Sequence, residues 1–571
     1  MRRWLSTGWD GVTRSNPDRV TYVGVFLLAI SLRILYLLVA RPVFESPYWT
    51  LSTSLLQNGS LSIDGVRTAA FEPGYPVFLA TVRAVVGDRV LLVQAVQCIV
   101  AALGAVFLCR LATVLSGKWQ VGVIAGVIYA VYPLLVRHSA DRSDAALMTM
   151  LLIAFASEFV AASTPVRAAG AGLWLGLAVL TRAMALPLVP LGAAIQWRDR
   201  GWRSAAVLTV SALVVVAPYA IRNYTLNGSV WPTRSGINLF ISNSEYSANI
   251  LPNYGPDILE DYAISVVERS GATAGLTGPA IERAYDALWT RYAVDEIRRH
   301  PWRTAGLKVR NVFYLFSPRL VPYHEPTPAT TIQLGENGAF TVEHSPPRRA
   351  VDQIVYAISY TPVLGLALAG VWLRRRELSR DAILWCVLAT FVVAHAVYFP
   401  TTRYRVPIEF VLLFYASVTL DASAVPRIMK TLKHLFKLSR QDLAIVTEAV
   451  IVAIPVEIAL RCVRLDTLVA RLGRVSRTER PQGDELDVER AARLVEAVAA
   501  YYPLRATCLK KSLVLFRILR KRGIPAELQL GVRKVHDDFT SHAWLECRGR
   551  VLLGEGITHF YRALPAVTRT E

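Results

Sequence analysis

Long apolar runs, separated by short polar and basic segments, dominate the chain as far as residue 423. A helix needs roughly 20 apolar residues to cross about 30 Å of hydrocarbon. The first run is too long for a signal-peptide core, so we interpret it as a retained membrane helix. The pattern predicts a polytopic α-helical membrane domain of about ten spans, at 20–40, 91–115, 119–137, 143–163, 168–181, 184–197, 204–221, 352–373, 382–399 and 404–422.

Charge follows the same division. The chain has 571 residues, 53% of them hydrophobic and 19% charged, and a net charge of +20. Because the basic residues lie between apolar runs, the positive-inside rule explains them and no nucleic-acid partner is predicted. The cytoplasmic basic residues are expected to be Arg2, Arg3, Arg14, Arg19, Arg198, Arg200, Arg203, Arg374, Arg375, Arg376, Lys430, Lys433 and Lys437. Both termini should therefore lie on the cytoplasmic side of a cell inner or plasma membrane.

Two polar segments are expected to be external. The segment 41–90 has no basic excess, and the segment 222–350 follows a span that ends outside. Within the second, Ala280–Arg299 has apolar residues at helical spacing and is predicted to be an amphipathic helix. Pro279 precedes it and suits a helix start, where a missing N–H costs nothing.

Composition shifts after residue 423. A basic stretch, Arg427–Arg440, is suited to an anionic membrane surface. The apolar segment Leu443–Val463 contains Glu448 and Glu457, and a charge at the bilayer centre costs roughly 2.5–3.5 kcal/mol. We therefore expect a buried or interfacial helix rather than an eleventh span.

The remaining boundaries follow from composition. Three regions are predicted: a membrane domain at 1–423, an apolar and amphipathic helical prefix with a charged linker at 424–489, and a compact α+β domain at 490–571. The six cysteines include no pair with metal-ligand spacing and no disulfide framework, so no metal site is predicted and a reducing cytoplasm suits the last domain.

Acidic residues and arginines recur in the segments expected outside. Arginine binds phosphate through two donors, and a carboxylate can act as general base toward an acceptor hydroxyl. Transfer of a sugar from a lipid-phosphate donor would use the arginines to hold the phosphate and the carboxylate as base. Direct displacement at the anomeric carbon would give a product of inverted configuration. The external set includes Asp64, Glu72 and Asp141, together with Glu45, Tyr48, Asp144, Arg222, Asn223, Arg403 and Arg405.

The order of short motifs resembles the C-type membrane glycosyltransferases, the group of protein O-mannosyltransferases and aminoarabinose transferases. The matching blocks, which fall within about 15–423, are Glu45-Ser-Pro-Tyr48, Glu72-Pro-Gly-Tyr, Ser143-Asp144, Leu180-Thr-Arg182, Arg222-Asn-Tyr and Arg403-Tyr-Arg-Val-Pro. The resemblance implies a polyprenyl-phosphate-linked sugar as donor, with a divalent metal left open. It maps the catalytic carboxylate to Glu45, where the family commonly has Asp, and suggests substrate-binding roles for Tyr48, Asp144, Arg182, Arg222, Asn223, Arg403 and Arg405.

Other interpretations of the membrane part stay open. Its loops could carry ordinary solvated charges, and Arg182 could simply extend from a helix end to water. A transporter is the sharper rival, although no internal repeat supports one.

The C-terminal domain contains a cysteine at a predicted helix start and a histidine at a predicted strand start. Apolar residues after Cys508 recur at helical spacing up to Gly523, so Cys508 lies where the helix dipole favours thiolate. His542 begins a second alternating segment, after a strand around 528–532. An imidazole beside such a thiol can deprotonate it.

The tail, over about 430–565, resembles the transglutaminase-like B protein of lasso-peptide biosynthesis. The matching blocks are Cys508-Leu-Lys-Lys-Ser-Leu, Arg522-Gly-Ile-Pro-Ala-Glu-Leu, Leu530-Gly-Val-Arg and His542-Ala-Trp-Leu-Glu. The resemblance implies a papain-like cysteine protease that removes the leader of a ribosomal precursor peptide, with Cys508 as nucleophile and His542 as base. It also implies a leader-recognition protein and an asparagine-synthetase-like cyclase as partners. The family's third residue, an Asp, falls on Gly554, so Glu555 is the candidate to orient His542.

We therefore predict a fusion of two enzymes, a glycosyltransferase-like membrane domain facing outward and a leader peptidase on the cytoplasmic side, with membrane lipid as a further partner. The alternatives are a non-catalytic, membrane-anchored scaffold that binds peptides, and a glycosyltransferase with a vestigial tail. For the single residues, Cys508 could be a buried thiol and His542 a satisfied core histidine.

Overall fold

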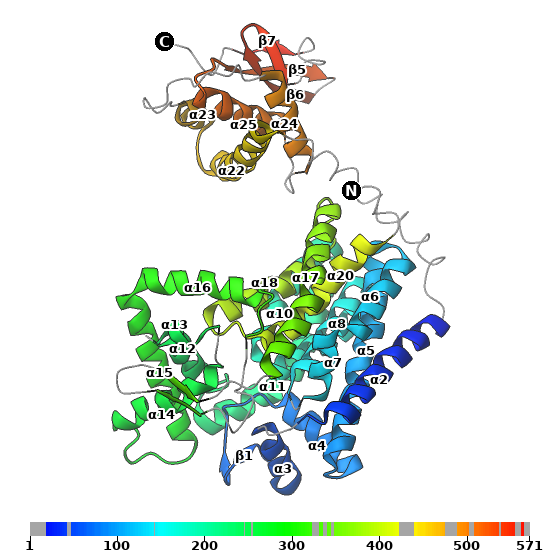
Figure 1. The fold of residues 1–571 in the computed structure, drawn as a ribbon, viewed down its shortest axis with the longest axis vertical. Coiled ribbons are helices and arrows are strands. Elements are labelled where there is room, and N and C mark those ends of the chain that lie inside the picture. The colour runs from blue at the N-terminus through cyan, green and yellow to red at the C-terminus, as the bar shows by residue number, and fades with distance from the viewer. Residues whose placement is uncertain are drawn as a thin grey trace. The chain divides into compact units, whose positions relative to one another are not determined.

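The computed structural model describes residues 19–42, 47–141, 143–244, 246–252, 255–321, 331–334, 340–343, 348–421, 439–473, 488–501, 507–535, 538–553 and 561–564. The chain divides into two compact units (Figure 1), which we call the helical unit (1–373 and 377–425) and the tail unit (374–376 and 426–571). Each is described by itself.

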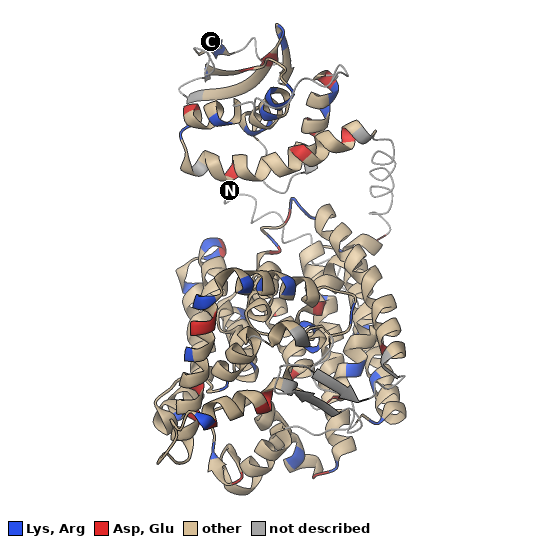
Figure 2. Ribbon diagram, turned by 60° about the vertical axis from the view of Figure 1, so that its left-hand side comes forward, with Lys and Arg blue, Asp and Glu red and all other residues tan. Residues whose placement is uncertain are grey.

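The helical unit is built on apolar helices with few charged side chains (Figure 2). Its longer helices are α2 (Arg19–Ala40), α5 (Val90–Ser116), α6 (Trp119–Val131), α8 (Ala145–Ala161), α9 (Pro165–Thr181), α10 (Leu188–Arg200), α11 (Trp202–Asn227), α17 (Arg348–Leu373), α18 (Ala382–Val397) and α20 (Glu409–Leu420). Shorter ones are α3 (Pro47–Asn58), α4 (Gly74–Val86), α7 (Pro133–Ala140) and α19 (Thr402–Arg405). Two-residue strands β1 (Ser62–Ile63) and β2 (Val66–Arg67) form a hairpin after α3.

Four of the predicted spans coincide with helices that are long and apolar enough to cross a membrane, namely α2, α5, α11 and the 350–373 part of α17. The span predicted at 119–137 is a bent pair, α6 and α7, with 55° between them. Pro133 begins the second helix of the pair, a position where its missing N–H costs no intrahelical hydrogen bond. The predicted 404–422 span is also interrupted, by a 3₁₀ turn at Val406–Ile408.

The remaining predicted spans are short helices. α8, α9 and α18 are apolar but have 17, 17 and 16 residues, and the span predicted at 184–197 falls on α10. Within the described residues, a further helix passes the length and hydropathy test at Gln441–Leu460, in the tail unit.

Glycines let α5 and α6 approach closely. A side chain at Gly122 would meet the backbone oxygen of Cys109 at 2.5 Å, and one at Gly126 would lie 3.2 Å from that of Ala105. Such a spacing of small residues allows two membrane helices to pack backbone against backbone. We call this contact the glycine seam.

The polar segment after α11 folds into α12 (Ser235–Asn243), α13 (Ser247–Ile250), α14 (Glu260–Arg269), α15 (Pro279–Arg299) and α16 (Pro301–Leu315), and a hairpin of β3 (Thr331–Leu334) and β4 (Phe340–Glu343). The predicted amphipathic helix is confirmed as α15. Trp289 and Ala293 are its most buried side chains.

In its described residues, the tail unit combines four helices with an antiparallel sheet. The helices are α22 (Arg440–Cys462), α23 (Leu465–Gly473), α24 (Val488–Tyr501) and α25 (Cys508–Lys521). The strands β5 (Glu527–Val535), β6 (Asp538–Cys547), β7 (Arg550–Leu553) and β8 (Arg562–Ala563) pair in the order β7-β6-β5-β8. α25 packs on β6 and also on α22 and α24, with the sheet on one side of it and α22 on the other (Figure 1). The α+β pattern predicted for this part is confirmed.

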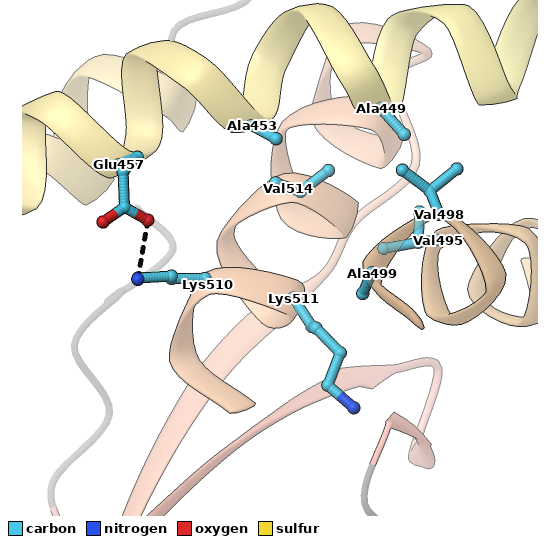
Figure 3. A pocket seen from close by; sticks show the side chains of 9 residues that line it. All are labelled: Ala449, Ala453, Glu457, Val495, Val498, Ala499, Lys510, Lys511 and Val514. Atoms are coloured by element: carbon cyan, nitrogen blue, oxygen red, sulfur yellow. Dashed lines mark ion pairs between the residues drawn. The ribbon is translucent and has the colours of Figure 1, made fainter. Parts of the chain in front are cut away.

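The two glutamates of α22 lie on the face that packs against α25. Glu457 Oε2 is 2.6 Å from Lys510 Nζ (Figure 3), and Glu448 pairs with Arg522 at 2.7 Å and with Lys521 at 3.5 Å. Between these pairs Ala449 and Val456 are buried in the core of the tail unit. The charges that interrupt the apolar segment therefore serve to attach α22 to α25.

Candidate functional sites

A buried cluster of charges lies where three segments of the helical unit meet. Asp144 caps the start of α8, Arg182 ends α9, and Arg403 lies in α19. Asp144 is 1% exposed and binds Arg182 through both carboxylate oxygens, with Arg182 Nη2 2.8 Å from Oδ1. Arg403 Nη2 donates to the same Oδ1 at 3.2 Å. Three residues from the predicted set are thus brought together, in a cluster with two cations and one anion.

Glu72 borders this cluster, although it was not among the residues predicted to bind or react. Its Oε1 accepts a hydrogen bond from the amide of Ala183, the residue after Arg182, at 3.1 Å. Burial raises the pKa of the Glu72 carboxyl above its usual value. A carboxylate with a raised pKa is a better proton acceptor. The signal was its position in the Glu72-Pro-Gly-Tyr block.

Tyr48 lies on α3 beside the same cluster. Its ring packs edge-on against Tyr75 and Phe71, with centroids 5.2 and 5.9 Å away. Burial raises the pKa of the Tyr48 hydroxyl, and the negative charges of Asp144 and Glu72 raise it further. The phenol therefore stays protonated and can donate a hydrogen bond.

The other predicted residues of the helical unit lie in different surroundings. Arg222 donates to the backbone oxygens of Thr68 at 2.8 Å and Leu61 at 3.3 Å, and to the side chain of its neighbour Asn223 at 2.9 Å. These contacts hold the segment around the β1–β2 hairpin against α11. Asn223 itself is fully buried.

Arg405 is fully enclosed. Its guanidinium binds Glu409 at 2.5 Å and the backbone oxygen of Leu315 at 2.7 Å, and it lies 3.6 Å from the ring centroid of Tyr360. Arg405 and Glu409 have no exposed surface. In this conformation Arg405 has no free face to offer a phosphate. Sequence could not show this, because Leu315 and Tyr360 are distant from Arg405 in the chain. Glu45, the predicted catalytic carboxylate, lies outside the described residues.

In the tail unit, Cys508 is the first residue of α25 and is half-buried. The helix starts here because Thr507 is its N-cap, with its hydroxyl accepting from the amide of Lys510 at 3.4 Å. One turn further on, the hydroxyl of Ser512 donates to the backbone oxygen of Ala543 at 3.5 Å. The start of α25 therefore lies along β6, next to the position of His542.

His542 lies on β6 opposite Gly531. Its ring is 5.3 Å from that of Tyr561 and 6.3 Å from that of Trp544. Strand alternation puts His542 and Trp544 on one face of the sheet, and Leu545, which packs in the core with α25, on the other. Burial, followed by the positive charge of Lys511, lowers the pKa of the His542 imidazole.

The two predicted catalytic side chains of the tail unit are on contacting elements, but no hydrogen bond joins them among the described residues. The Nε2 atom of His542 is buried and has no hydrogen-bond partner in that same part of the chain. Glu555, the candidate orienting group, lies outside the described residues. No group of three or more His, Cys, Asp or Glu side chains that could hold a metal occurs among the residues that the structure covers.

A comparison with protein families finds a match within the tail unit. Residues 450–564 match the transglutaminase-like superfamily, so the tail unit carries a transglutaminase-like domain, and the match already begins within α22. No curated protein matches the chain.

Membrane glycosyltransferases are among the solved structures to which this chain is similar. One is the Archaeoglobus fulgidus oligosaccharyltransferase AglB in complex with an inhibitory peptide and a dolichol-phosphate, with a TM-score of 0.40, 12% identity and coverage of 88% of this chain and 55% of that one. Another is ArnT from Cupriavidus metallidurans bound to undecaprenyl phosphate, with a TM-score of 0.34, 14% identity and coverage of 71% and 79%. The chain spans little more than half the length of the oligosaccharyltransferase. With TM-scores below 0.5, no residue role is carried over.

Proposed function

We propose that the tail unit is a cysteine peptidase that removes the leader of a ribosomal precursor peptide, as in lasso-peptide maturation. The observation that supports this is the placement of Cys508 at the start of α25, alongside the strand that carries His542. His542 lies on the face of the sheet opposite Leu545, which packs in the core with α25, so the proposal requires the imidazole to turn toward Cys508 when substrate binds. Hydrogen bonds between catalytic groups often form only in the substrate complex.

The reaction would follow the usual course for a thiol nucleophile. The His542 imidazole takes the Cys508 proton, and the sulfur attacks the scissile carbonyl carbon to form a C–S bond. The C–N bond then breaks and the imidazolium gives its proton to the leaving amine. Water, deprotonated by the imidazole, hydrolyses the thioester and restores the thiol. The lowered pKa of His542 keeps the imidazole neutral, and so able to accept a proton, to lower pH.

The test is mass spectrometry of a candidate precursor peptide incubated with the full chain, its Cys508→Ala variant or Cys547→Ala. Cys547 is a buried cysteine at the end of β6, the strand that carries His542, and serves as the control. Cleavage by the unmodified chain and by Cys547→Ala, but not by Cys508→Ala, supports the peptidase. Binding of the peptide without cleavage by any of the three would favour the non-catalytic scaffold instead.

We further propose that the helical unit transfers a sugar from a polyprenyl-phosphate donor at the face that carries Asp144, with both termini and the tail unit on the opposite, cytoplasmic side. Support comes from the two arginines gathered on Asp144 and from Glu72 beside them. The cations would hold the donor phosphate, and Glu45 would act as the base toward the acceptor hydroxyl.

Two variants test this proposal. Transfer of a radiolabelled sugar from a polyprenyl-phosphate donor should be lost in Glu45→Gln if that carboxylate is the base. Glu72→Gln gives the comparison, since Glu72 lies beside the cluster with a raised pKa. Undiminished transfer in Glu45→Gln with loss in Glu72→Gln would move the base to Glu72, and undiminished transfer in both would contradict a carboxylate base.

A further inference from the structure

One face of α22 carries large aliphatic side chains that none of the described residues of the tail unit covers. Val450, Ile451, Ile454 and Ile458 are 43–63% exposed, and Leu443 is 56% exposed. Their spacing places them on a single stripe along the helix, opposite the buried Ala449 and Val456. We call these five side chains the α22 stripe. An apolar surface of this kind on a soluble face marks an interaction site.

Basic side chains from α25 border the stripe. Arg517, Lys521 and Arg522 line a hollow of about 720 Å³ together with Leu443 and Ile451. Glu448, on the floor of this hollow, pairs with Lys521 and Arg522. With three cations and one anion around it, the hollow keeps a positive balance next to the aliphatic stripe.

Aliphatic side chains beside cations match one partner, the surface of an anionic bilayer. Acyl chains accept the aliphatic groups and lipid phosphates accept the cations, each cation near such a surface adding roughly fivefold to binding. The bilayer is always within reach. Only residues 421–439, at about 3.5 Å each when fully extended, connect α20 of the helical unit to α22.

We infer that α22 docks the tail unit onto an anionic membrane surface, lying in the interface with its stripe among the upper acyl chains. Crossing the bilayer would require α22 to leave α25 and break the ion pairs of Glu448 and Glu457. Lying in the interface keeps both pairs, because the glutamates are on the face toward α25. The inference is independent of whether Cys508 is catalytic.

The experiment uses the full chain in lipid nanodiscs, with the photoreactive residue benzoylphenylalanine in place of Ile454. Irradiation should yield phospholipid adducts, detected by mass spectrometry, in discs of mixed phosphatidylglycerol and phosphatidylcholine. The yield should fall several-fold in pure phosphatidylcholine, and also at about 0.5 M salt, where the Debye length is roughly half its value at physiological ionic strength. The same residue in place of Leu564, which is 43% exposed elsewhere in the tail unit, gives the background.

Paired substitutions test the cations. Arg517→Gln with Lys521→Gln should lower the adduct yield several-fold, whereas Arg493→Gln with Arg550→Gln, two exposed cations outside the hollow, should not. Three outcomes would overturn the inference: adducts no more frequent than at Leu564, crosslinks to a second copy of the chain in place of lipid, or a yield that ignores lipid charge and salt, as a membrane-spanning helix would give.

Discussion

The buried cluster at Asp144 makes a sharp prediction about the stability of the helical unit. Asp144→Asn keeps the side chain's shape but removes a negative charge that directly contacts both Arg182 and Arg403. Asparagine retains one acceptor oxygen for the two guanidinium groups. Removing one partner of a buried ion pair costs about 3–5 kcal/mol, because the remaining charge is left uncompensated. The unfolding constant should therefore rise by roughly two to four powers of ten.

Two buried cysteines provide the assay. Cys98 and Cys109 are fully buried in the helical unit, so a thiol-reactive fluorophore labels them only when that unit opens. Melting of the full chain in detergent, followed through this dye, should shift to clearly lower temperature in Asp144→Asn. Asp199→Asn is the matched control, since the Arg198–Asp199 pair has a similar distance of 2.8 Å but is about half exposed and should contribute at most about 1 kcal/mol.

A double substitution refines the result. Arg182→Met in the Asp144→Asn background removes a cation that has lost its partner, and should recover part of the lost stability. If Asp144→Asn melts with the unmodified chain, or no differently from Asp199→Asn, the cluster does not stabilise the fold and the reasoning from its burial is wrong.

Three further predictions concern other parts of the chain. Lys511 helps to lower the pKa of His542, so Lys511→Met should raise that pKa and move the acid limb of the pH profile for Cys508 alkylation by iodoacetamide to higher pH. Lys510→Met, which loses the pair with Glu457, should leave the acid limb in place. Equal shifts in the two variants would show that Lys511 does not have this role. A side chain at Gly370 would meet the backbone of Tyr415, whereas one at Gly365 meets nothing within 4 Å. Gly370→Ala should therefore lower the free energy of unfolding by roughly 1–3 kcal/mol or more and lower the dye-detected melting temperature, and Gly365→Ala should do neither. Similar melting of the two variants would contradict the packing. Thr507→Ala removes the N-cap of α25 and should cost the tail unit about 0.5–2 kcal/mol, measured by hydrogen exchange along α25; unchanged exchange would show that the cap is dispensable.

The architecture could largely be predicted because hydrophobic periodicity depends on local sequence. The apolar run at 91–115 predicted α5 almost to the residue, and the alternation around 528–532 predicted β5. Breaks were harder. The run at 404–422 is continuous enough to predict a span. It does not reveal that Arg405, near its start, is enclosed by Glu409 together with Leu315 and Tyr360, which belong to other segments.

The sites were predictable as residue types and less so as contacts. Motif order singled out Asp144, Arg182 and Arg403, which the fold brings together across 38 and 259 positions. Motif order did not reveal that Glu72 joins them through the amide of Ala183. Nearly every residue has a backbone N–H, so residue types do not indicate which amide donates. Periodicity alone also does not determine whether His542 lies on the face of β6 that packs against α25 or on the opposite face, because that depends on how α25 packs against the sheet.

The glycine seam between α5 and α6 determines how the helical unit should respond to cold. Lipid tails are as apolar as the side chains they surround, so expulsion of water contributes little to this contact and close van der Waals packing contributes most. Water expulsion weakens on cooling, whereas dispersion attraction does not depend on it. A chilled preparation should therefore keep these two helices joined at temperatures where contacts that rely on solvent, such as the core of the tail unit, have begun to loosen.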